Sequence, residues 1–281
     1  MIEVKNVSYT YMSGGPFETA ALKNVSLSLE DGAFIGLMGH TGSGKSTLVQ
    51  IIGGLEKPTE GSVVIDGQTL HSKECDMRAM RFKIGLVMQY PEYQLFEETV
   101  FRDIAFGPTN MGLSEQEIRD RVELAADLAG VKRELLEKSP FELSGGQKRR
   151  AAIAGILAMQ PKILILDEPT AGLDPAGREE LLHKIRDLHK RLGITVLFVS
   201  HSMEDIASMA DRIIVMNRGE AVMSGRPGEI FSRAEQLRGM GLSVPGITDI
   251  CDGLRKRGMP LPEGIYTMDR AVSEIERLLK K

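Results

Sequence analysis

The sequence of 281 residues has few of the features that mark secreted or membrane-spanning proteins. It contains only two cysteines, Cys75 and Cys251, and their spacing fits neither a disulfide framework nor a metal site. No apolar run approaches the ~18 residues that cross a bilayer, and Met1–Lys5 lacks the apolar core of a signal peptide. We therefore expect a protein of the reducing cytosol that reaches a membrane through partners, without inserting into it.

An excess of charge of either sign is also missing. The chain has 35 basic and 39 acidic residues, which gives a formal net charge of −4. This balance argues against a general attraction to nucleic acid or to anionic lipid. The hydrophobic content of 42% and the charged content of 26% are ordinary for a globular protein. The length suits one large α/β domain with a small appendix.

Short apolar segments alternate with segments of helical spacing along much of the chain. The segments expected as strands of one sheet are Phe34–Met38, Ile84–Met88, Ile163–Leu166 and Thr195–Val199. Near-continuous apolar strands that alternate with helices predict an α/β fold whose parallel sheet is covered on both faces. At the N-terminus, residues 2–7 and 25–29 alternate between apolar and polar, which predicts a separate antiparallel β-subdomain.

The pattern divides the chain into a main domain and an extension. Residues 1–235 form the expected main domain, with residues 90–160 as an inserted helical lobe. In residues 236–281, prolines punctuate two short helices. Their expected apolar stripes are Ile247, Ile250, Cys251 and Leu254 on the first helix, and Val272, Ile275, Leu278 and Leu279 on the second. These stripes either form dimer contacts or cover the core.

A glycine-rich loop follows the apolar segment Phe34–Met38. It reads Gly39-His40-Thr41-Gly42-Ser43-Gly44-Lys45-Ser46, with Thr47 next. Its glycines allow the backbone to wrap a polyphosphate with the N–H groups inward, and the following helix adds its positive N-terminal dipole. Lys45 would reach the β- and γ-phosphates, and Ser46 would place its hydroxyl on Mg²⁺. The loop therefore predicts a nucleoside triphosphate site.

A carboxylate pair, Asp167 and Glu168, ends the apolar segment Ile163–Leu166. Carboxylates at the carboxyl edge of a parallel sheet face the ligand crevice. Asp167 would hold Mg²⁺, directly or through water. Glu168 would polarise the attacking water as general base. Beside the phosphate loop, this interpretation is favoured over an ordinary solvated strand end.

A second glycine-rich stretch, Leu143-Ser144-Gly145-Gly146-Gln147, precedes a helical run. A Ser-x-x-Gln sequence is an ordinary helix-capping box, but that role does not explain Gly145 and Gly146. Glycine destabilises a helix start unless something must approach the backbone closely. An exposed helix N-terminus with bare backbone is an anion site. Because one copy has no need of a second γ-phosphate site, we expect this site to serve a nucleotide held by another subunit.

These motifs together resemble the ATP-binding-cassette (ABC) ATPases. Leu-Ser-Gly-Gly-Gln is similar to the signature of that family, and the order phosphate loop, glutamine, signature, Asp-Glu, histidine matches it across about residues 1–235. The resemblance implies a P-loop NTPase core that hydrolyses ATP with Mg²⁺. It also implies a head-to-tail dimer in which Lys45, Ser46 and Asp167 of one subunit face the signature of the other.

The resemblance implies three further site residues. Gln89, after the segment Ile84–Met88, resembles the loop glutamine that senses Mg²⁺ and the attacking water. His201 resembles the switch histidine that contacts the γ-phosphate. Asp174 ends Ala171-Gly172-Leu173-Asp174, which resembles the loop that crosses the dimer seam. Without the resemblance, Gln89 would be a polar strand end, His201 a structural histidine, and Asp174 a helix cap before Pro175.

The adenine ring needs an aromatic partner, for which Tyr11 is the first candidate. Its alternative role is that of a strand-edge tyrosine. The segment Ser13–Glu18 lengthens the connection to the next strand and leaves Phe17 as a rival.

The stretch after Gln89 points to a subgroup of the family. Tyr90-Pro91-Glu92-Tyr93-Gln94-Leu95-Phe96 resembles the Pro-Glu-x-Gln-apolar helix of energy-coupling factor (ECF) transporter ATPases, and the loop Ser13–Glu18 and the C-terminal extension also look like that group. With Pro16-Phe17-Glu18 early in the sequence, the chain is similar to the second of the paired subunits. On physical grounds alone, these aromatic residues either pack the lobe or shape a groove for a partner's helix. The resemblance implies a peripheral subunit on the cytoplasmic face of the cell membrane. It would pair with a second ATPase, with a heterodimer favoured, beneath a membrane T-component and a substrate-binding S-component.

The resemblance therefore implies an ATPase that energises uptake of a vitamin or a transition-metal ion. One alternative is the ATPase of another ABC importer with a conventional transmembrane dimer. A second is a non-transport ABC protein that acts on nucleic acid or ribosomes, although the chain lacks the long coiled coil or second cassette usual in those proteins. A third is a catalytically inactive regulatory half, which the intact motifs disfavour.

Overall fold

Six strands form the central sheet of the computed structural model, which describes residues 1–280. Their order is β10-β9-β3-β8-β7-β6, and neighbouring strands from β9 to β6 are parallel. The bounds are β3 Phe34–Met38, β6 Ile84–Val87, β7 Ile163–Asp167, β8 Thr195–Val199, β9 Arg212–Asn217 and β10 Glu220–Gly225. Strand β10 is antiparallel to β9. The predicted parallel core is confirmed, and β6 ends one residue before the expected Met88.

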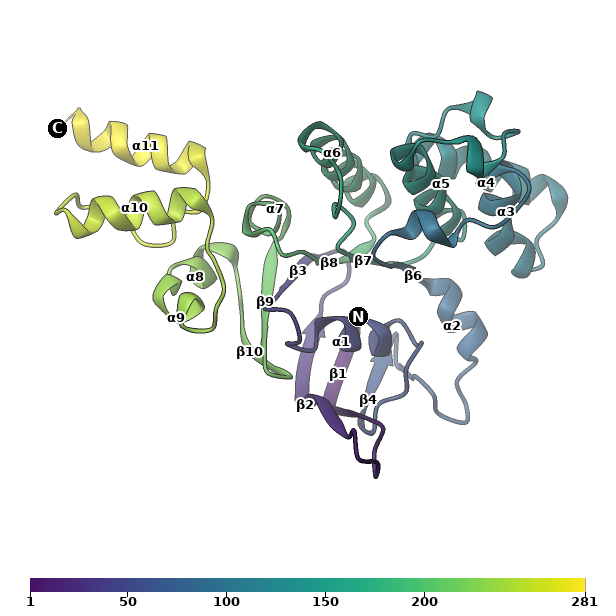
Figure 1. Ribbon diagram of the computed structural model, residues 1–281, viewed down its shortest axis with the longest axis horizontal. Coiled ribbons are helices and arrows are strands. Elements are labelled where there is room, and N and C mark those ends of the chain that lie inside the picture. The colour runs from purple at the N-terminus through teal and green to yellow at the C-terminus, as the bar shows by residue number, and fades with distance from the viewer. Residues whose placement is uncertain (281) are drawn as a thin grey trace.

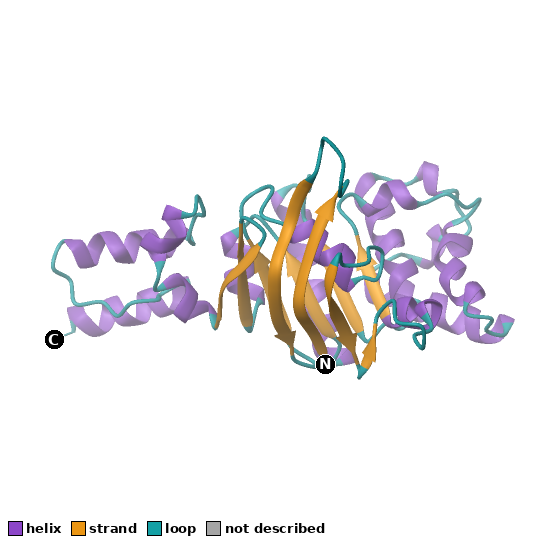
Figure 2. Ribbon diagram, turned by 90° about the horizontal axis from the view of Figure 1, so that it is seen from below, coloured by secondary structure: helices purple, strands orange, loops and turns teal. Residues whose placement is uncertain are grey.

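The predicted N-terminal antiparallel subdomain is also confirmed. Its sheet has the order β2-β1-β4-β5, with β1 Ile2–Tyr11, β2 Thr19–Leu29, β4 Glu60–Ile65 and β5 Gln68–Thr69. Its apolar faces and the helix α1 (Lys45–Ile52) share one buried cluster with Ile35 and Leu37 of β3. Figure 2 shows these strands at the centre of the molecule, with helices to either side. This packing holds the loop between β3 and α1 against two sheets.

A helical lobe projects from one end of the central sheet (Figure 1). Its longer helices α3, α4 and α5 pack against one another. The helical elements of the lobe are η1 Pro91–Gln94, α3 Val100–Asn110, α4 Glu115–Ala129, η2 Arg133–Leu135, η3 Pro140–Glu142 and α5 Gly145–Leu157, while α2 Met77–Lys83 precedes β6 and packs against it. The short helix expected after Gln89 is a single 3-10 turn, η1. The lobe carries the second glycine-rich stretch at the start of α5.

The remaining helices cover the sheet and lead to the C-terminus. They are α6 Pro175–Leu192, α7 Met203–Met209, α8 Pro227–Phe231, α9 Ala234–Gly239, α10 Gly246–Lys256 and α11 Met268–Leu279. The main core continues through Leu237, Leu242 and Val244, beyond the expected domain boundary at residue 235. None of the helices in residues 1–280 is both long and apolar enough to span a membrane.

Helices α10 and α11 form a pair that extends away from the sheet (Figure 1, yellow). They share a small core of their own, made by Cys251, Leu261, Ile265 and Ala271. Of the predicted stripes, Cys251 is buried in this core and Ile247, Leu254, Ile275 and Leu278 pack against it, while Ile250, Val272 and Leu279 are exposed. The stripes therefore do not cover the main core within residues 1–280, and their role as dimer contacts stays a prediction.

Candidate active site

The phosphate loop joins β3 to α1, and its backbone is shaped by close packing. Gly44 has φ of +99°, and a Cβ there would lie 2.6 Å from the carbonyl oxygen of Ala21. A Cβ on Gly39 would lie 2.5 Å from the carbonyl oxygen of Met216. Both contacts are too short for any larger residue, so these two positions require glycine for the fold itself.

Lys45 is buried inside this loop. Its Nζ donates hydrogen bonds to the carbonyl oxygens of Gly39 and His40, at 2.7 and 3.0 Å. Burial lowers the pKa of Lys45, against the opposing charges of Glu168 and Asp167. The buried hydroxyl of Ser43 has no hydrogen-bond partner within residues 1–280. The loop thus concentrates donors that an anionic ligand would satisfy.

The carboxylate pair ends β7, beside the phosphate loop. Asp167 is buried, and burial together with the charge of Glu168 raises its pKa, although Lys45, His201 and the Ser46 hydroxyl oppose the rise. Glu168 has a left-handed backbone with φ of +50°, which is rare for a residue other than glycine. Its N–H donates to the carbonyl oxygen of Val199 at 3.0 Å. This contact anchors the turn that redirects the Glu168 side chain.

Three residues predicted to act together do meet. The Nε2 atom of His201 lies 2.7 Å from Oε1 of Glu168. The Nε2 atom of Gln89 donates to the other carboxylate oxygen, Oε2, at 3.4 Å. The carboxylate of Glu168 is therefore held from both sides, by side chains that follow β6 and β8.

These residues line a cavity of about 520 Å³ at the carboxyl edge of the sheet. The size suits a small-molecule ligand. Its lining comprises Tyr11, Thr19, Ala20, Ala21, Thr41, Gly42, Gly44, Lys45, Ser46, Thr47, Gln89, Glu168 and His201. The backbone of Thr19–Ala21 was missed by the sequence analysis, because a strand edge without a distinctive side chain gives no sequence signal.

Tyr11 lies at the mouth of this cavity. Its hydroxyl is 3.1 Å from Oγ1 of Thr47, and its ring packs edge-to-face against Tyr9 at a centroid distance of 4.8 Å. The rival Phe17 is 76% exposed and does not line the cavity. Adenine stacking on Tyr11 remains a prediction, since the same position also suits a strand-edge tyrosine.

The second glycine-rich stretch begins α5 and does not line this cavity. Ser144 and Gln147 form the expected capping box: the Gln147 N–H donates to Oγ of Ser144, and the Ser144 N–H donates to Oε1 of Gln147. A Cβ built on Gly145 meets no atom within 4 Å. The fold of this chain therefore does not explain the glycine there.

Asp174 likewise lies outside the cavity lining. Its Oδ1 accepts a hydrogen bond from the Gly177 N–H at 2.8 Å and caps α6. This contact matches the cap that the sequence predicts without any resemblance. Its predicted place at a dimer seam remains a prediction.

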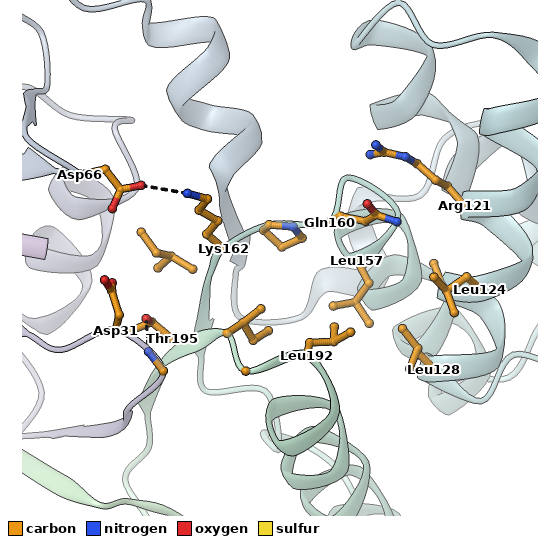
Figure 3. Close-up of a pocket in the computed structure, with 16 residues that line it drawn as sticks. Asp31, Asp66, Arg121, Leu124, Leu128, Leu157, Gln160, Lys162, Leu192 and Thr195 are labelled. Carbon is orange, nitrogen blue, oxygen red and sulfur yellow. Dashed lines mark hydrogen bonds and ion pairs between the residues drawn. The ribbon is translucent and has the colours of Figure 1, made fainter. Parts of the chain in front are cut away.

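A second cavity, of about 550 Å³, lies at the opposite edge of the sheet (Figure 3). Leu124, Leu157 and Leu192 line it, and Lys162 lies 3.3 Å from Asp66 at its rim. None of the predicted site residues reaches it. The predicted site residues therefore gather at the carboxyl edge, although the larger of these two cavities lies at the amino edge.

Comparisons with known proteins agree with this geometry. Residues 22–171 match the family described as ABC transporter. The chain is 56% identical over 279 residues to the energy-coupling factor transporter ATP-binding protein EcfA2 of Caldanaerobacter subterraneus subsp. tengcongensis, covering 99% of this chain and 98% of that protein. It is 50% identical over 280 residues to the protein of the same name from Clostridium perfringens, with the same coverage. The chain is an ABC ATPase of the energy-coupling factor type.

Solved structures of ATP-binding proteins also resemble this ABC ATPase. The structure of cbiO1 from Clostridium perfringens, described as part of the ABC transporter complex cbiONQ, is 38% identical and has a TM-score of 0.75. It aligns with 89% of this chain and 98% of that chain. The cassette MJ0796, described as a dimer in a post-hydrolysis state bound to ADP and Pi, is 34% identical with a TM-score of 0.72. That alignment covers 80% of this chain and 98% of that chain.

The oxygen donors of the ATPase site suit Mg²⁺. Within residues 1–280, no three His, Cys, Asp or Glu residues form a metal-binding group. Mg²⁺ keeps several waters and needs only one or two protein oxygens beside the phosphates. The Ser46 hydroxyl, at the start of α1, and the Asp167 carboxylate, at the end of β7, supply such oxygens. The predicted residues Ser46, Gln89 and Asp167 thus fit the ion in chemistry.

One residue near the site was missed by the sequence analysis. Arg149, on α5, is only 4% exposed and forms an ion pair with Glu92. A charged residue in a helix usually lies on the solvent-exposed face, so no sequence signal distinguished Arg149 from its neighbours. Its burial depends on η1 and on the loop after Glu168, which are distant in sequence.

Proposed function

We propose that this ATPase powers an ECF-type importer as one half of a pair of cassettes, each completing the other's reaction centres. The phosphate loop and Glu168 line one cavity, while the signature residues Ser144–Gln147 lie outside it. The exposed start of α5 is suited to a γ-phosphate held by another subunit. A heterodimer is the favoured pairing.

The observation that carries the proposed chemistry is the position of the Glu168 carboxylate, held between His201 and Gln89. Glu168 orients a water and accepts its proton as the water oxygen bonds to the γ-phosphorus and the bond to the β–γ bridging oxygen breaks. ADP and phosphate leave. Lys45 offsets the negative charge on the phosphates. When bound, Mg²⁺ would be held by Ser46, Asp167 and Gln89 and would neutralise charge on the β- and γ-phosphate oxygens.

The membrane partner is proposed to bind a groove beside η1. A cavity of about 280 Å³ there is lined by Leu95, Phe96 and Phe106, among others. Phe96 and Phe106 pack edge-to-face at 5.0 Å, and Tyr93, on η1, is 84% exposed. An apolar groove with exposed aromatic residues suits a helix of a T-component. The T-component would bind an S-component that selects a vitamin or a transition-metal ion, while this ATPase would lie at the cytoplasmic face of the cell membrane.

The C-terminal helices are proposed to add to the contact between paired cassettes. The exposed side chains Ile250, Val272 and Leu279 leave apolar surface on α10 and α11 beyond their small shared core. A second ATPase subunit would cover this surface, and none of these three residues lines the proposed nucleotide site.

Substitution of Tyr93 tests the proposed partner. Because its side chain is almost fully exposed, Tyr93→Ala should leave folding and ATP binding unchanged. We expect co-purification with the T-component to fall by ~5-fold or more, as for loss of an aromatic anchor at an interface. The exposed Leu124 on α4, which does not line the groove, offers the control Leu124→Ala. Equal recovery of the T-component with Tyr93→Ala and with the unaltered chain would contradict the proposal.

A further inference from the structure

Arg149 stands out because its guanidinium is buried and makes four hydrogen bonds. Its Nε and Nη2 atoms donate to the two carboxylate oxygens of Glu92, at 3.0 and 2.7 Å. Its Nη1 donates to the carbonyl oxygens of Pro169 and Ala171, at 3.1 and 2.8 Å. Four hydrogen bonds thus run from one side chain to two separate segments.

Arg149 connects three parts of the chain that have different proposed roles. Glu92 belongs to η1, beside the proposed partner groove. Pro169 and Ala171 follow Glu168 and lead to Asp174. Arg149 itself lies one turn into α5, the helix whose exposed start is the signature. One guanidinium therefore joins the membrane-facing segment, the loop after the catalytic carboxylate and the signature helix.

The ion pair between Arg149 and Glu92 is well desolvated on both sides. Their side chains are 4% and 15% exposed. Burial acts to raise the pKa of Glu92, but hydrogen bonds from Arg149 and from the Glu92 N–H, with the charge of Arg149, keep it below its ordinary value. Loss of one partner would leave a buried, unpaired charge, so the arrangement resists opening.

The arrangement also depends on the shape of arginine. A planar guanidinium can grip a carboxylate with two parallel N–H groups and still present a third edge to carbonyl oxygens. A lysine at this position would keep the charge but would lose the fork. The two segments also adjoin directly, since a Cβ on Gly172 would lie 3.5 Å from Cε1 of Tyr90.

We propose that Arg149 is a positioning residue that makes residues 90–96, the loop 169–174 and the start of α5 move as one body. A partner that displaces η1 would then shift the signature and the Asp174 loop, both of which the proposed pairing assigns to the neighbouring subunit's nucleotide. Glu92 is the point at which this body is held on its membrane-facing side. The proposal deepens, and rests on, the proposed pairing and membrane partner.

Hydrogen exchange in the isolated chain tests the connection without any partner. Glu92→Gln removes the carboxylate charge of η1. The Glu92 side chain makes no hydrogen bond to residues 169–174, so the substitution can reach that loop only through Arg149. We expect faster amide exchange at 90–96 and also at 169–174, because Arg149 loses its anchor. The matched control is Arg102→Gln, which breaks an exposed ion pair with Glu98 in the same lobe. Exchange at 169–174 equal to that of the unaltered chain would overturn the proposal.

Kinetics of the assembled transporter test the use of the connection. In the full complex, Glu92→Gln and Arg149→Lys should lower kcat for ATP hydrolysis by ~10-fold, as expected for misplaced reacting groups, while KM for ATP stays within ~2-fold. Arg102→Gln should leave both unchanged. An unaltered kcat in both Glu92→Gln and Arg149→Lys would overturn the proposal. A chain that fails to assemble with any membrane partner would instead refute the proposed function, while the exchange result would still stand.

Discussion

The two glycine-rich stretches of this ATPase look alike in sequence, but the packing around their glycines differs. In the phosphate loop, Gly39 and Gly44 are required by the chain's own backbone, which comes within 2.6 Å of where a Cβ would lie. At the start of α5, the space around Gly145 is open. The packing of this chain therefore requires Gly39 and Gly44 in the phosphate loop. It does not require Gly145, whose backbone is open to contact by another molecule.

The same contrast holds for the groups around each stretch. Around the phosphate loop, Lys45, Asp167 and Glu168 are buried or held by neighbours before any ligand arrives. Around the signature, Ser144 and Gly145 are exposed, and Ser144 bonds only to its own helix. The residues around the phosphate loop are thus positioned by the chain's own contacts, whereas the start of α5 is exposed. The proposed pairing would bring these unlike surfaces of two subunits together.

The largest expected effect comes from Glu168→Gln. The amide keeps the hydrogen-bonding shape but cannot accept the water's proton, so we expect ATP hydrolysis to fall by ~100-fold or more. ATP binding should remain, and the closed pair should accumulate. Single-turnover hydrolysis and sedimentation with ATP measure both effects. Normal turnover in this variant would remove Glu168 from its assigned role.

The next effect separates the two kinds of glycine. Gly145→Ala should fold normally, because a Cβ there meets nothing, yet hydrolysis by the assembled pair should fall by ~10-fold through poorer contact with the neighbour's γ-phosphate. Its own phosphate loop should bind ATP as before. The measurements are thermal unfolding, nucleotide affinity and hydrolysis rate.

Gly44→Ala is the matched contrast. A Cβ at a φ of +99°, 2.6 Å from a carbonyl oxygen, should cost about 1–3 kcal/mol of folding stability. Chemical denaturation measures it. If Gly145→Ala proved as destabilising as Gly44→Ala, the distinction between the two stretches would fail.

Asp167→Asn should produce a smaller effect, on stability. Burial and the charge of Glu168 raise the pKa of Asp167 in the folded state. The carboxylate therefore opposes folding above that raised pKa, and the opposition disappears once the pH falls below the ordinary aspartate range. Asp167→Asn should raise the Tm of the ligand-free protein at pH 7, and the gain should fade in acid. A gain that grew as the pH fell would contradict the assignment.

The smallest effect is expected at the C-terminal helices. Val272→Glu places a charge on the exposed face of α11 and should leave the Tm of the cassette nearly unchanged. If a second subunit covers that face, pairing should weaken by ~10-fold, as for a buried unpaired charge. Sedimentation with the partner subunit measures it. Unchanged pairing would assign these helices to another role.

Much of the architecture could be predicted because its signals are local. The strands of the central sheet are short, nearly uninterrupted apolar runs, and α6 begins at Pro175, directly after the helix cap expected at Asp174. The C-terminal stripes show what such signals leave open, because helical periodicity indicates that a face is apolar but not how much of it a neighbour covers. Only the structure shows that Cys251 is buried while Ile250 and Val272 are exposed.

By itself, the sequence determined the loop that wraps phosphate, the carboxylates at a strand end and the capping box of the signature, because each depends on residues adjacent along the chain. Only the tertiary structure decided which groups meet. Gln89 and His201 reach Glu168 because β6, β7 and β8 are neighbours in the sheet. Arg149 finds Glu92 because α5 packs against η1. Contacts of this kind depend on how distant segments fold together, which adjacency along the chain does not specify.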